Sequence, residues 1–159
     1  LPPVPMSQSA TTMSKLMTPD EANVYGNVHG GSILKYIDEA AAVAAWRHAR
    51  QPKVVTVSLE RMDFREPVYI GDILHIKATV RHVGRTSMLV GVRVEAENPT
   101  TGEVRHTASC YITFVALDRN NKPTPVPGVV AETEEEKEKM ARAKRVAEII
   151  RQSREQQQG

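Results

Sequence analysis

The stretch NVHGGSILKYIDEAAAVAAW, residues 27–46, decides the fold of this chain. Its apolar side chains recur on nearly all sides of a helix, which predicts a helix over about residues 30–48, ended by Gln51 and Pro52. Such a helix must be surrounded by other elements, because no side of it suits water. Two adjacent carboxylates, Asp38 and Glu39, interrupt the apolar pattern and need an explanation.

After this helix the hydrophobic period changes from about 3.6 to 2, which is typical of strands. The alternating segments cover residues 54–64, 73–83, 87–97 and 103–117, and a shorter one lies near 13–17. Long strands joined by short loops indicate antiparallel pairing, because parallel neighbours need crossover connections. The sequence therefore predicts an α+β fold in which a curved antiparallel sheet wraps one long central helix.

Residues 131–157 predict a second helix. Thr133 and Glu136 have the spacing of a capping box, in which each side chain bonds the other's backbone N–H. A narrow apolar stripe on this helix needs a partner, either the domain or another subunit. The Lys and Arg residues on its other faces have two interpretations, a solvated face and a contact with a phosphate-bearing ligand. The stripe consists of Met140, Ala143, Val146, Ala147 and Ile150.

The composition is that of one folded domain with an appendage. The chain has 159 residues, 40% hydrophobic and 25% charged, and its net charge of +2 is too small to indicate a nucleic-acid partner. No apolar run approaches the roughly 20 residues of a membrane span. One cysteine, Cys110, excludes an internal disulfide and predicts a cytoplasmic location; we interpret it as a packed core residue. We expect a folded domain over residues 9–128, a helical extension over 129–159, and a disordered segment or processing remnant at 1–8.

The start of the first helix combines residues that suit chemistry. Gly30 and Gly31 let the backbone approach a ligand and leave free N–H groups, which can hold an oxygen that gains negative charge. The simpler interpretation is a tight turn into the helix, and Asn27 and His29 can be ordinary loop residues. Their combination with an isolated carboxylate is what indicates a site.

The two carboxylates also have two interpretations. On an exposed stripe, Asp38 and Glu39 would both pair with Lys35. Against this, nothing polar follows from residue 40 to residue 46, so no solvated stripe continues past them. At least one carboxylate should therefore lie in a groove or at a subunit seam, where such groups mark working sites. We assign Glu39 to the pair with Lys35 and Asp38 to the site.

These residues carry a resemblance to a family. TPDEANVYGNVHGGSILKYIDEAA, residues 18–41, resembles the hotdog-fold acyl-CoA thioesterases, in particular the long-chain acyl-CoA hydrolase group of bacteria and of the tandem animal brain enzymes. The resemblance continues through VVTVSLERMDFREPVYIGDIL, GRTSMLVGVRVEAE and PVPGVVAETEEEK, and spans about residues 16–139. It implies a curved antiparallel sheet around one helix, in agreement with the pattern above.

The resemblance also implies roles for the site residues. Asp38 matches the catalytic carboxylate, Asn27 matches the catalytic asparagine, and the amides of Gly30 and Gly31 match the oxyanion hole. The tandem enzymes divide the catalytic pair between two domains, so a single domain implies a homodimer with Asn27 and Asp38 from different subunits. The family commonly forms hexamers from three dimers.

Coenzyme A, as part of substrate and product, is expected at two places, and no separate cofactor or metal is expected. Gly84, Arg85, Thr86 and Ser87 form a strand connection whose amides, hydroxyls and cation can meet phosphate, although from the residues alone a plain turn is the simpler interpretation. Their match to the family's coenzyme A region favours the first interpretation. By the same resemblance, the edge at Val57 and Ser58 is expected to pair with the pantetheine amides.

The resulting function is hydrolysis of fatty acyl-CoA to fatty acid and coenzyme A. Asp38 acts as general base or as nucleophile, and the sequence leaves both open. Asn27 orients the water or the carbonyl. The leading alternative is a non-catalytic acyl-CoA-binding module on the same fold. A dehydratase would need a catalytic His in a different motif, and a nucleic-acid protein would need a stacking platform or a recognition helix.

Overall fold

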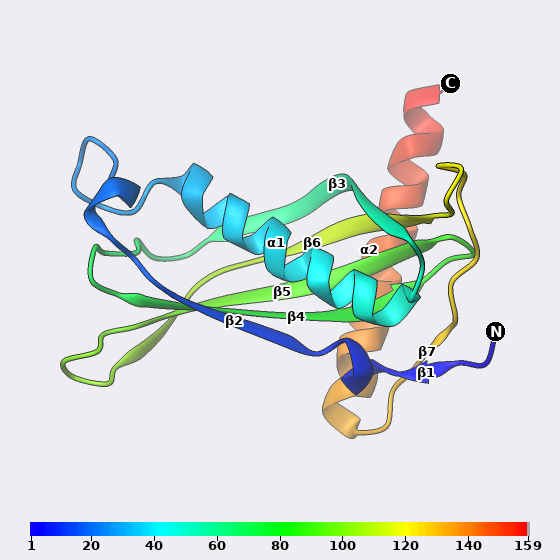
Figure 1. The fold of residues 1–159 in the computed structure, drawn as a ribbon, viewed down its shortest axis with the longest axis horizontal. Helices are drawn as coiled ribbons and strands as arrows, with labels where there is room; N and C mark the ends of the chain where they lie inside the picture. The colour runs from blue at the N-terminus through cyan, green and yellow to red at the C-terminus, as the bar shows by residue number, and fades with distance from the viewer. Residues whose placement is uncertain (159) are drawn as a thin grey trace.

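The computed structural model describes residues 1–158 and confirms the predicted α+β fold (Figure 1). A five-stranded antiparallel sheet has the order β2-β4-β5-β6-β3. The long helix that packs on this sheet is α1 (Gly30–Ala49). The strands are β2 (Thr11–Leu16), β3 (Lys53–Phe64), β4 (Ile73–Val83), β5 (Ser87–Glu97) and β6 (Val104–Leu117).

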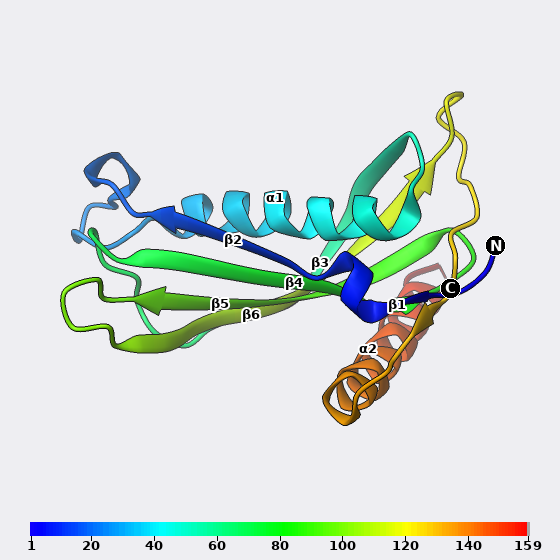
Figure 2. The ribbon, with the colours of Figure 1, turned by 60° about the horizontal axis from the view of Figure 1, so that its bottom comes forward.

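The two helices lie on opposite faces of this sheet (Figure 2). α1 packs small side chains, such as Ala41, Ala44 and Ala45, against one face, which lets the helix come close to the strands. Its other side stays open: the side chains of Val43 and Trp46 are 46% and 50% exposed. The sheet of one chain thus covers only one side of a helix whose apolar pattern predicts a full enclosure.

The second helix, α2 (Glu134–Gln158), begins at the predicted capping box. The Glu136 N–H donates to Thr133 Oγ1 at 3.1 Å, and the Thr133 N–H donates to Glu136 Oε1 at 3.3 Å. Ala143 and Val146 then pack on Leu89, so the apolar stripe finds its partner on β5. No helix among residues 1–158 is long and apolar enough to cross a membrane.

The N-terminal residues differ from the expected disorder. β1 (Val4–Pro5) pairs in parallel with β7 (Val129–Val130), and η1 (Met6–Ser9) follows. The Met6 side chain is buried, and Ser9 Oγ accepts a hydrogen bond from the Val80 N–H at 2.9 Å. Segments this short show no hydrophobic period, which is why the sequence does not reveal them.

Candidate functional site

The loop before α1 is held by its own polar groups. Between η2 (Pro19–Glu21) and α1, the Asn23 Oδ1 atom accepts hydrogen bonds from the backbone N–H groups of Tyr25 (2.9 Å) and Asn27 (3.1 Å). The Asn23 N–H donates to the carbonyl of Asn27 at 2.7 Å. This bonding folds the loop back on itself and leaves the side-chain NH₂ of Asn23 available to a ligand.

Asn23 and Asn27 both line a cavity of about 380 Å³ at the start of α1, together with Gly30, Phe64 and Val68. Asn27 and Gly30, which the sequence singles out, thus share one hollow. The sequence does not single out Asn23, because Asn is common in turn-forming loops. Only the folded structure shows that Asn23 lines the same cavity as Asn27.

Of the two glycine N–H groups at the start of α1, one is already hydrogen-bonded and the other is not. His29 is the N-cap of α1, and its Nδ1 atom accepts the Gly31 N–H at 3.0 Å. Only a ring nitrogen without a proton can accept in this way. The Gly30 N–H makes no hydrogen bond within the described part of the chain. Gly30 therefore offers the free donor, whereas the Gly31 N–H is already bonded to His29.

Asp38 lies on the open side of α1 and faces β3. Its Oδ1 atom accepts a hydrogen bond from Thr56 Oγ1 at 2.7 Å. Thr56 is a partner of Asp38 that the sequence does not reveal, since a Thr in a strand is expected on propensity alone. The predicted pair of Glu39 with Lys35 is absent, because neither side chain takes part in an ion pair among residues 1–158.

One subunit does not bring Asp38 to the helix start. Gly30 and Asp38 are eight residues apart on a continuous helix, a rise of about 12 Å. A hydrogen bond spans about 3 Å, so the amides and the carboxylate cannot hold the same small group. The predicted site residues therefore fall into two groups on one chain.

The edge strand β3 exposes apolar side chains on both of its faces near Asp38. β3 is the last strand of the sheet, and Val55, Val57 and Leu59 are between 40% and 47% exposed. Val57 has no partner in the register with β6, which marks a bulge between Thr56 and Ser58. An unpaired, apolar edge of this kind is a site where another chain adds.

The expected coenzyme A residues gather at one end of the sheet. Phe114 pairs with both Met88 and Thr56, so the β4–β5 turn and the bulge of β3 lie at the same level, two strand spacings or about 10 Å apart. The turn is closed by the Gly84 N–H, which donates to the carbonyl of Ser87 at 2.9 Å.

The C-terminal half of α2 covers this end. Gly84 and Ser87 line a cavity of about 390 Å³ with Arg151 and Arg154. Arg154 also donates from Nη2 to Ser58 Oγ at 3.3 Å. The basic face of α2 therefore contacts the sheet as well as solvent. Arg151 and Arg154 add two guanidinium groups to the region that is predicted to bind phosphate.

A buried carboxylate ties the loop to the helix. Tyr36 OH donates a hydrogen bond to Glu21 Oε1, which raises the pKa of Tyr36 to about 12 and lowers the pKa of Glu21. The backbone carbonyl of Glu21 also accepts the His29 N–H at 2.7 Å. Glu21 thus fixes the capping histidine relative to α1.

The described residues offer neither a reactive cysteine nor a cluster of metal ligands. Cys110 is buried, as predicted, and burial raises the pKa of its thiol to about 12, so the nucleophilic thiolate does not form near neutral pH. Among the residues that the structure describes, no three His, Cys, Asp or Glu side chains are grouped as metal ligands would be.

Comparisons with known proteins agree with this architecture. The model of the thioesterase superfamily matches residues 25–103. A Bacillus subtilis protein described as an uncharacterized acyl-CoA thioester hydrolase is 40% identical over 129 residues, which are 81% of this chain and 74% of that protein.

Two solved structures are similar over nearly the whole chain. An apo-hexameric acyl-CoA thioesterase is 40% identical with a TM-score of 0.92, covering 96% of this chain and 97% of its own. An acyl-CoA hydrolase from Staphylococcus aureus, in complex with butyryl coenzyme A and coenzyme A, is 34% identical with a TM-score of 0.92 and covers 99% and 95%.

Proposed function

This chain belongs to the acyl-CoA thioester hydrolases of the thioesterase superfamily, and from that membership we propose which residues carry out each step of the reaction. The reaction is hydrolysis of an acyl-CoA to a carboxylic acid and coenzyme A. The observation that carries the assignment of residues is the carboxylate of Asp38, held by Thr56 beside the unpaired edge of β3. We propose fatty acyl-CoA as the substrate class.

Asp38 provides the reacting carboxylate, as general base or as nucleophile. Thr56 holds Oδ1 at 2.7 Å, which leaves Oδ2 free to take a proton from water or to attack the thioester carbon. The carbonyl oxygen gains negative charge as the attack proceeds, and helix-start amides stabilise it. The C–S bond then breaks, and the thiolate, whose pKa is about 8.5, leaves without a strong acid. If Asp38 attacks directly, water then hydrolyses the resulting anhydride and restores the carboxylate.

Asn23 fits the role of the catalytic asparagine better than Asn27 does. In the S. aureus hydrolase, alanine variants were made at an asparagine and at an aspartate 15 positions after it, and the asparagine variant was studied with coenzyme A. Asn23 lies 15 positions before Asp38, whereas Asn27 lies 11 before it. Since both side chains line the same cavity, we propose that Asn23 binds the carbonyl or the water and that Asn27 remains a second candidate.

The same comparison supports Thr56. A third S. aureus alanine variant replaces a threonine 17 positions after the aspartate, and Thr56 lies 18 positions after Asp38. A difference of one position is small for a strand that carries a bulge next to this residue. We propose that Thr56 orients the Asp38 carboxylate.

A homodimer completes the site. About 12 Å of helix separates the amides of one subunit from its own Asp38, and the apolar edge of β3 lies open beside that carboxylate. We propose that two chains pair along β3, so that the helix start of one subunit meets Asp38 of the other. Three such dimers would form a hexamer like that of the similar thioesterase.

Coenzyme A lies, in this proposal, between Val57 and Ser58 of β3 and the turn of Gly84, Arg85, Thr86 and Ser87. The turn's cavity contains two arginines of α2, which suits phosphate. The reaction needs no additional cofactor. We also propose a cytoplasmic location, consistent with the unpaired Cys110.

A thiol-release assay over acyl-CoAs of increasing chain length tests this function. We expect turnover by the wild type, a loss of at least a hundredfold for Asp38→Ala, and less than a threefold change for the matched neighbour Glu39→Ala. Equal rates for wild type and Asp38→Ala would overturn the assignment. Tight binding of acyl-CoA without any thiol release would instead support the non-catalytic binding module.

Mixed subunits test the shared site. Asn23→Ala and Asp38→Ala chains, each inactive alone, are refolded together, and the mixed dimers are isolated by two different affinity tags. One intact site per dimer predicts about half of the wild-type rate. No recovery in verified mixed dimers would show that each subunit carries a complete site. The same experiment with Asn27→Ala decides between the two asparagines.

A further inference from the structure

The loop before α1 presents two apolar side chains to solvent at its tip. Val24 is 93% exposed and Tyr25 is 84% exposed. The loop lies at the end of the molecule where α1 begins (Figure 1), beside the cavity that Asn23 and Asn27 line. Gly, Pro, Asn, Asp and Ser are the usual residues of turns, so turn geometry does not explain two consecutive apolar residues at this tip.

Two further exposed aromatic rings lie beside this loop. Phe64 is half exposed and lines the same cavity as Asn23 and Asn27. Tyr69 is also half exposed, and its backbone forms an isolated bridge with Asn27. A group of exposed apolar side chains indicates a surface that something covers, whereas a single one does not. The name apolar rim is used below for Val24, Tyr25, Phe64 and Tyr69.

Hydrogen bonds hold the loop tip in one conformation. The Gly26 N–H donates to the carbonyl of Asn23 at 3.1 Å, which closes a β-turn with Val24 and Tyr25 at its two central positions. Asn23 Oδ1 accepts the Tyr25 N–H at 2.9 Å, and Gly26 has a φ of +84°, which glycine adopts without strain. A tip fixed in this way loses little conformational freedom when it makes a contact, so it suits recognition.

The tip lies close to the groups that are proposed to react. Asn23, the first residue of the turn, lines the cavity at the start of α1 together with Gly30. Tyr25 follows Asn23 by two residues, a chain distance of no more than about 7 Å. In the proposed dimer this helix start meets Asp38 of the partner subunit, next to the exposed apolar side chains of β3. The thioester would then have apolar surface on both sides.

We propose that Tyr25 contacts the acyl chain of the substrate and makes the site selective for acyl groups long enough to reach the loop tip. The inference rests on the proposed function, because it treats the helix start and Asp38 of the partner subunit as one site. The polar part of the substrate, coenzyme A, is assigned to the turn at residues 84–87 and its arginines. The apolar part needs an apolar surface, and each methylene that the apolar rim removes from water favours binding. The Tyr25 ring supplies a large contact area with few rotatable bonds.

Thiol release from a series of saturated substrates, from acetyl-CoA to lauroyl-CoA below its micellar concentration, tests this selectivity. We expect the wild-type kcat/KM to rise with chain length. Tyr25→Ala should lower kcat/KM at least tenfold for lauroyl-CoA and less than threefold for acetyl-CoA, because an acetyl group ends before the tip. Tyr25→Phe keeps the ring and should retain the wild-type profile. Ile149→Ala removes a half-exposed apolar side chain from α2, across the sheet, and is the matched control that should change neither rate (Figure 2).

Mixed dimers show at which site Tyr25 acts. When an Asp38→Ala chain pairs with an Asn23→Ala chain, the one intact site combines Asn23 of the first chain with Asp38 of the second. Tyr25→Ala added to the first chain should remove the preference for lauroyl-CoA. The same substitution in the second chain should leave the preference unchanged. An equal effect from either chain would overturn the proposal.

A wild type that releases no thiol from any acyl-CoA would overturn the proposed function, and this inference with it. An active wild type with Tyr25→Ala slowed by one common factor at every chain length would overturn only the role of Tyr25. Sedimentation velocity then distinguishes two reasons. A separated dimer shows that the apolar rim packs on the partner chain instead of the acyl chain, and an intact dimer shows that Tyr25 serves the loop alone. Because Tyr25 is exposed, its substitution should leave the circular dichroism spectrum unchanged.

Discussion

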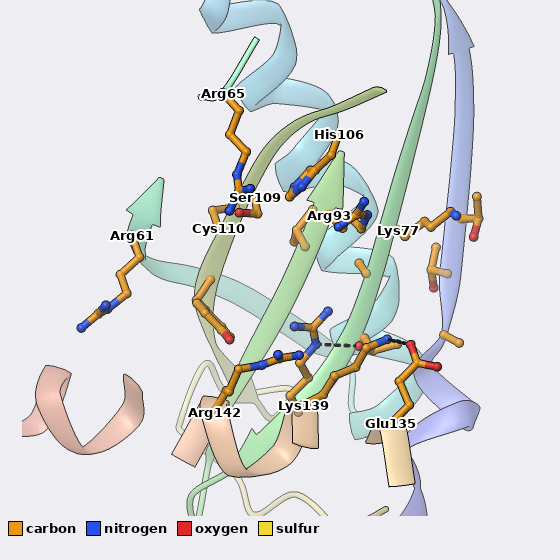
Figure 3. Close-up of a pocket in the computed structure, with 18 residues that line it drawn as sticks. Arg61, Arg65, Lys77, Arg93, His106, Ser109, Cys110, Glu135, Lys139 and Arg142 are labelled. Carbon is orange, nitrogen blue, oxygen red and sulfur yellow. Dashed lines mark hydrogen bonds and ion pairs between the residues drawn. The ribbon is translucent and has the colours of Figure 1, made fainter. Parts of the chain in front are cut away.

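The two faces of the sheet are incomplete in opposite ways. The α1 face has an apolar edge with one carboxylate, Asp38, and its site residues are about 12 Å apart on the same helix. The α2 face has a basic cavity of about 780 Å³ (Figure 3), lined by seven Lys and Arg side chains and by one carboxylate, that of Glu135. The first face lacks apolar contacts, which the proposed partner chain would supply. The second face carries an excess of positive charge. The two faces thus differ in the kind of contact that each lacks.

The largest effect should follow from charging the β3 edge. Leu59→Lys places a cation on the exposed edge strand β3, where it would be buried by a pairing chain at a cost of several kcal/mol. We expect the dimer to separate in sedimentation velocity and turnover to fall by at least a hundredfold, while the far-UV spectrum stays that of the wild type.

Val104→Lys is the matched control for this prediction, because Val104 is comparably exposed on β6, away from the β3 edge. It should change neither assembly nor rate. An active, monomeric Leu59→Lys protein would show that one chain contains a complete site, and the contrast between the two faces would fail.

A smaller effect should follow from removal of the Thr56 hydroxyl. Thr56→Val keeps the shape of the side chain and deletes the hydrogen bond to Asp38, which as a bond to a charged group contributes about 1.5–3 kcal/mol. We expect kcat to fall about tenfold to a hundredfold with little change in KM. Thr56→Ser restores the hydroxyl and should recover most of the rate. A Thr56→Val protein with wild-type kcat would remove Thr56 from the site.

Thr56 also shows where sequence reasoning ends. The period change after α1 predicts the strands almost residue by residue, because burial on one side of a sheet imposes alternation. Asp38 stands out because a carboxylate in an apolar helix is unfavourable without a partner. Thr56 and Asn23 are ordinary in their local sequence and gain meaning only from what the fold places beside them. The Glu39–Lys35 pair follows from helix spacing alone, and spacing does not fix side-chain direction.

A pH dependence of stability should distinguish buried His48, on α1, from partly buried His82, beside α2. His48, near the end of α1, is fully buried; Nε2 bonds the carbonyl of Pro127 at 2.7 Å, and burial lowers the pKa of His48. The unfolded chain, with a pKa near about 6.5, therefore binds the proton more readily. The stability that neutral His48 contributes is present above that pKa and is lost as the pH falls below it, at no more than about 1.4 kcal/mol per pH unit.

Thermal unfolding from pH 8 to pH 5 checks this. His48→Gln keeps an N–H donor for Pro127, and its Tm should fall less steeply below about pH 6.5 than that of the wild type. His82, beside α2, also has a pKa lowered by burial and by Lys144, so His82→Gln is the comparison from the other face. If neither variant changes the slope, burial of these rings does not limit stability in acid.

The smallest effect concerns the helix that forms one wall of the basic cavity. Thr133→Ala removes one half of the α2 capping box, at a cost of about 1 kcal/mol in a first turn that is solvent-exposed. Because Ala143 and Val146 still pack on Leu89, the helix itself should persist, and hydrogen exchange should rise only over its first two turns. Lys139 lies within those turns and Arg142 follows directly after them, on the face of the sheet opposite Asp38, so thioester hydrolysis should be unchanged. A loss of hydrolysis would mean that the two faces are coupled rather than separate.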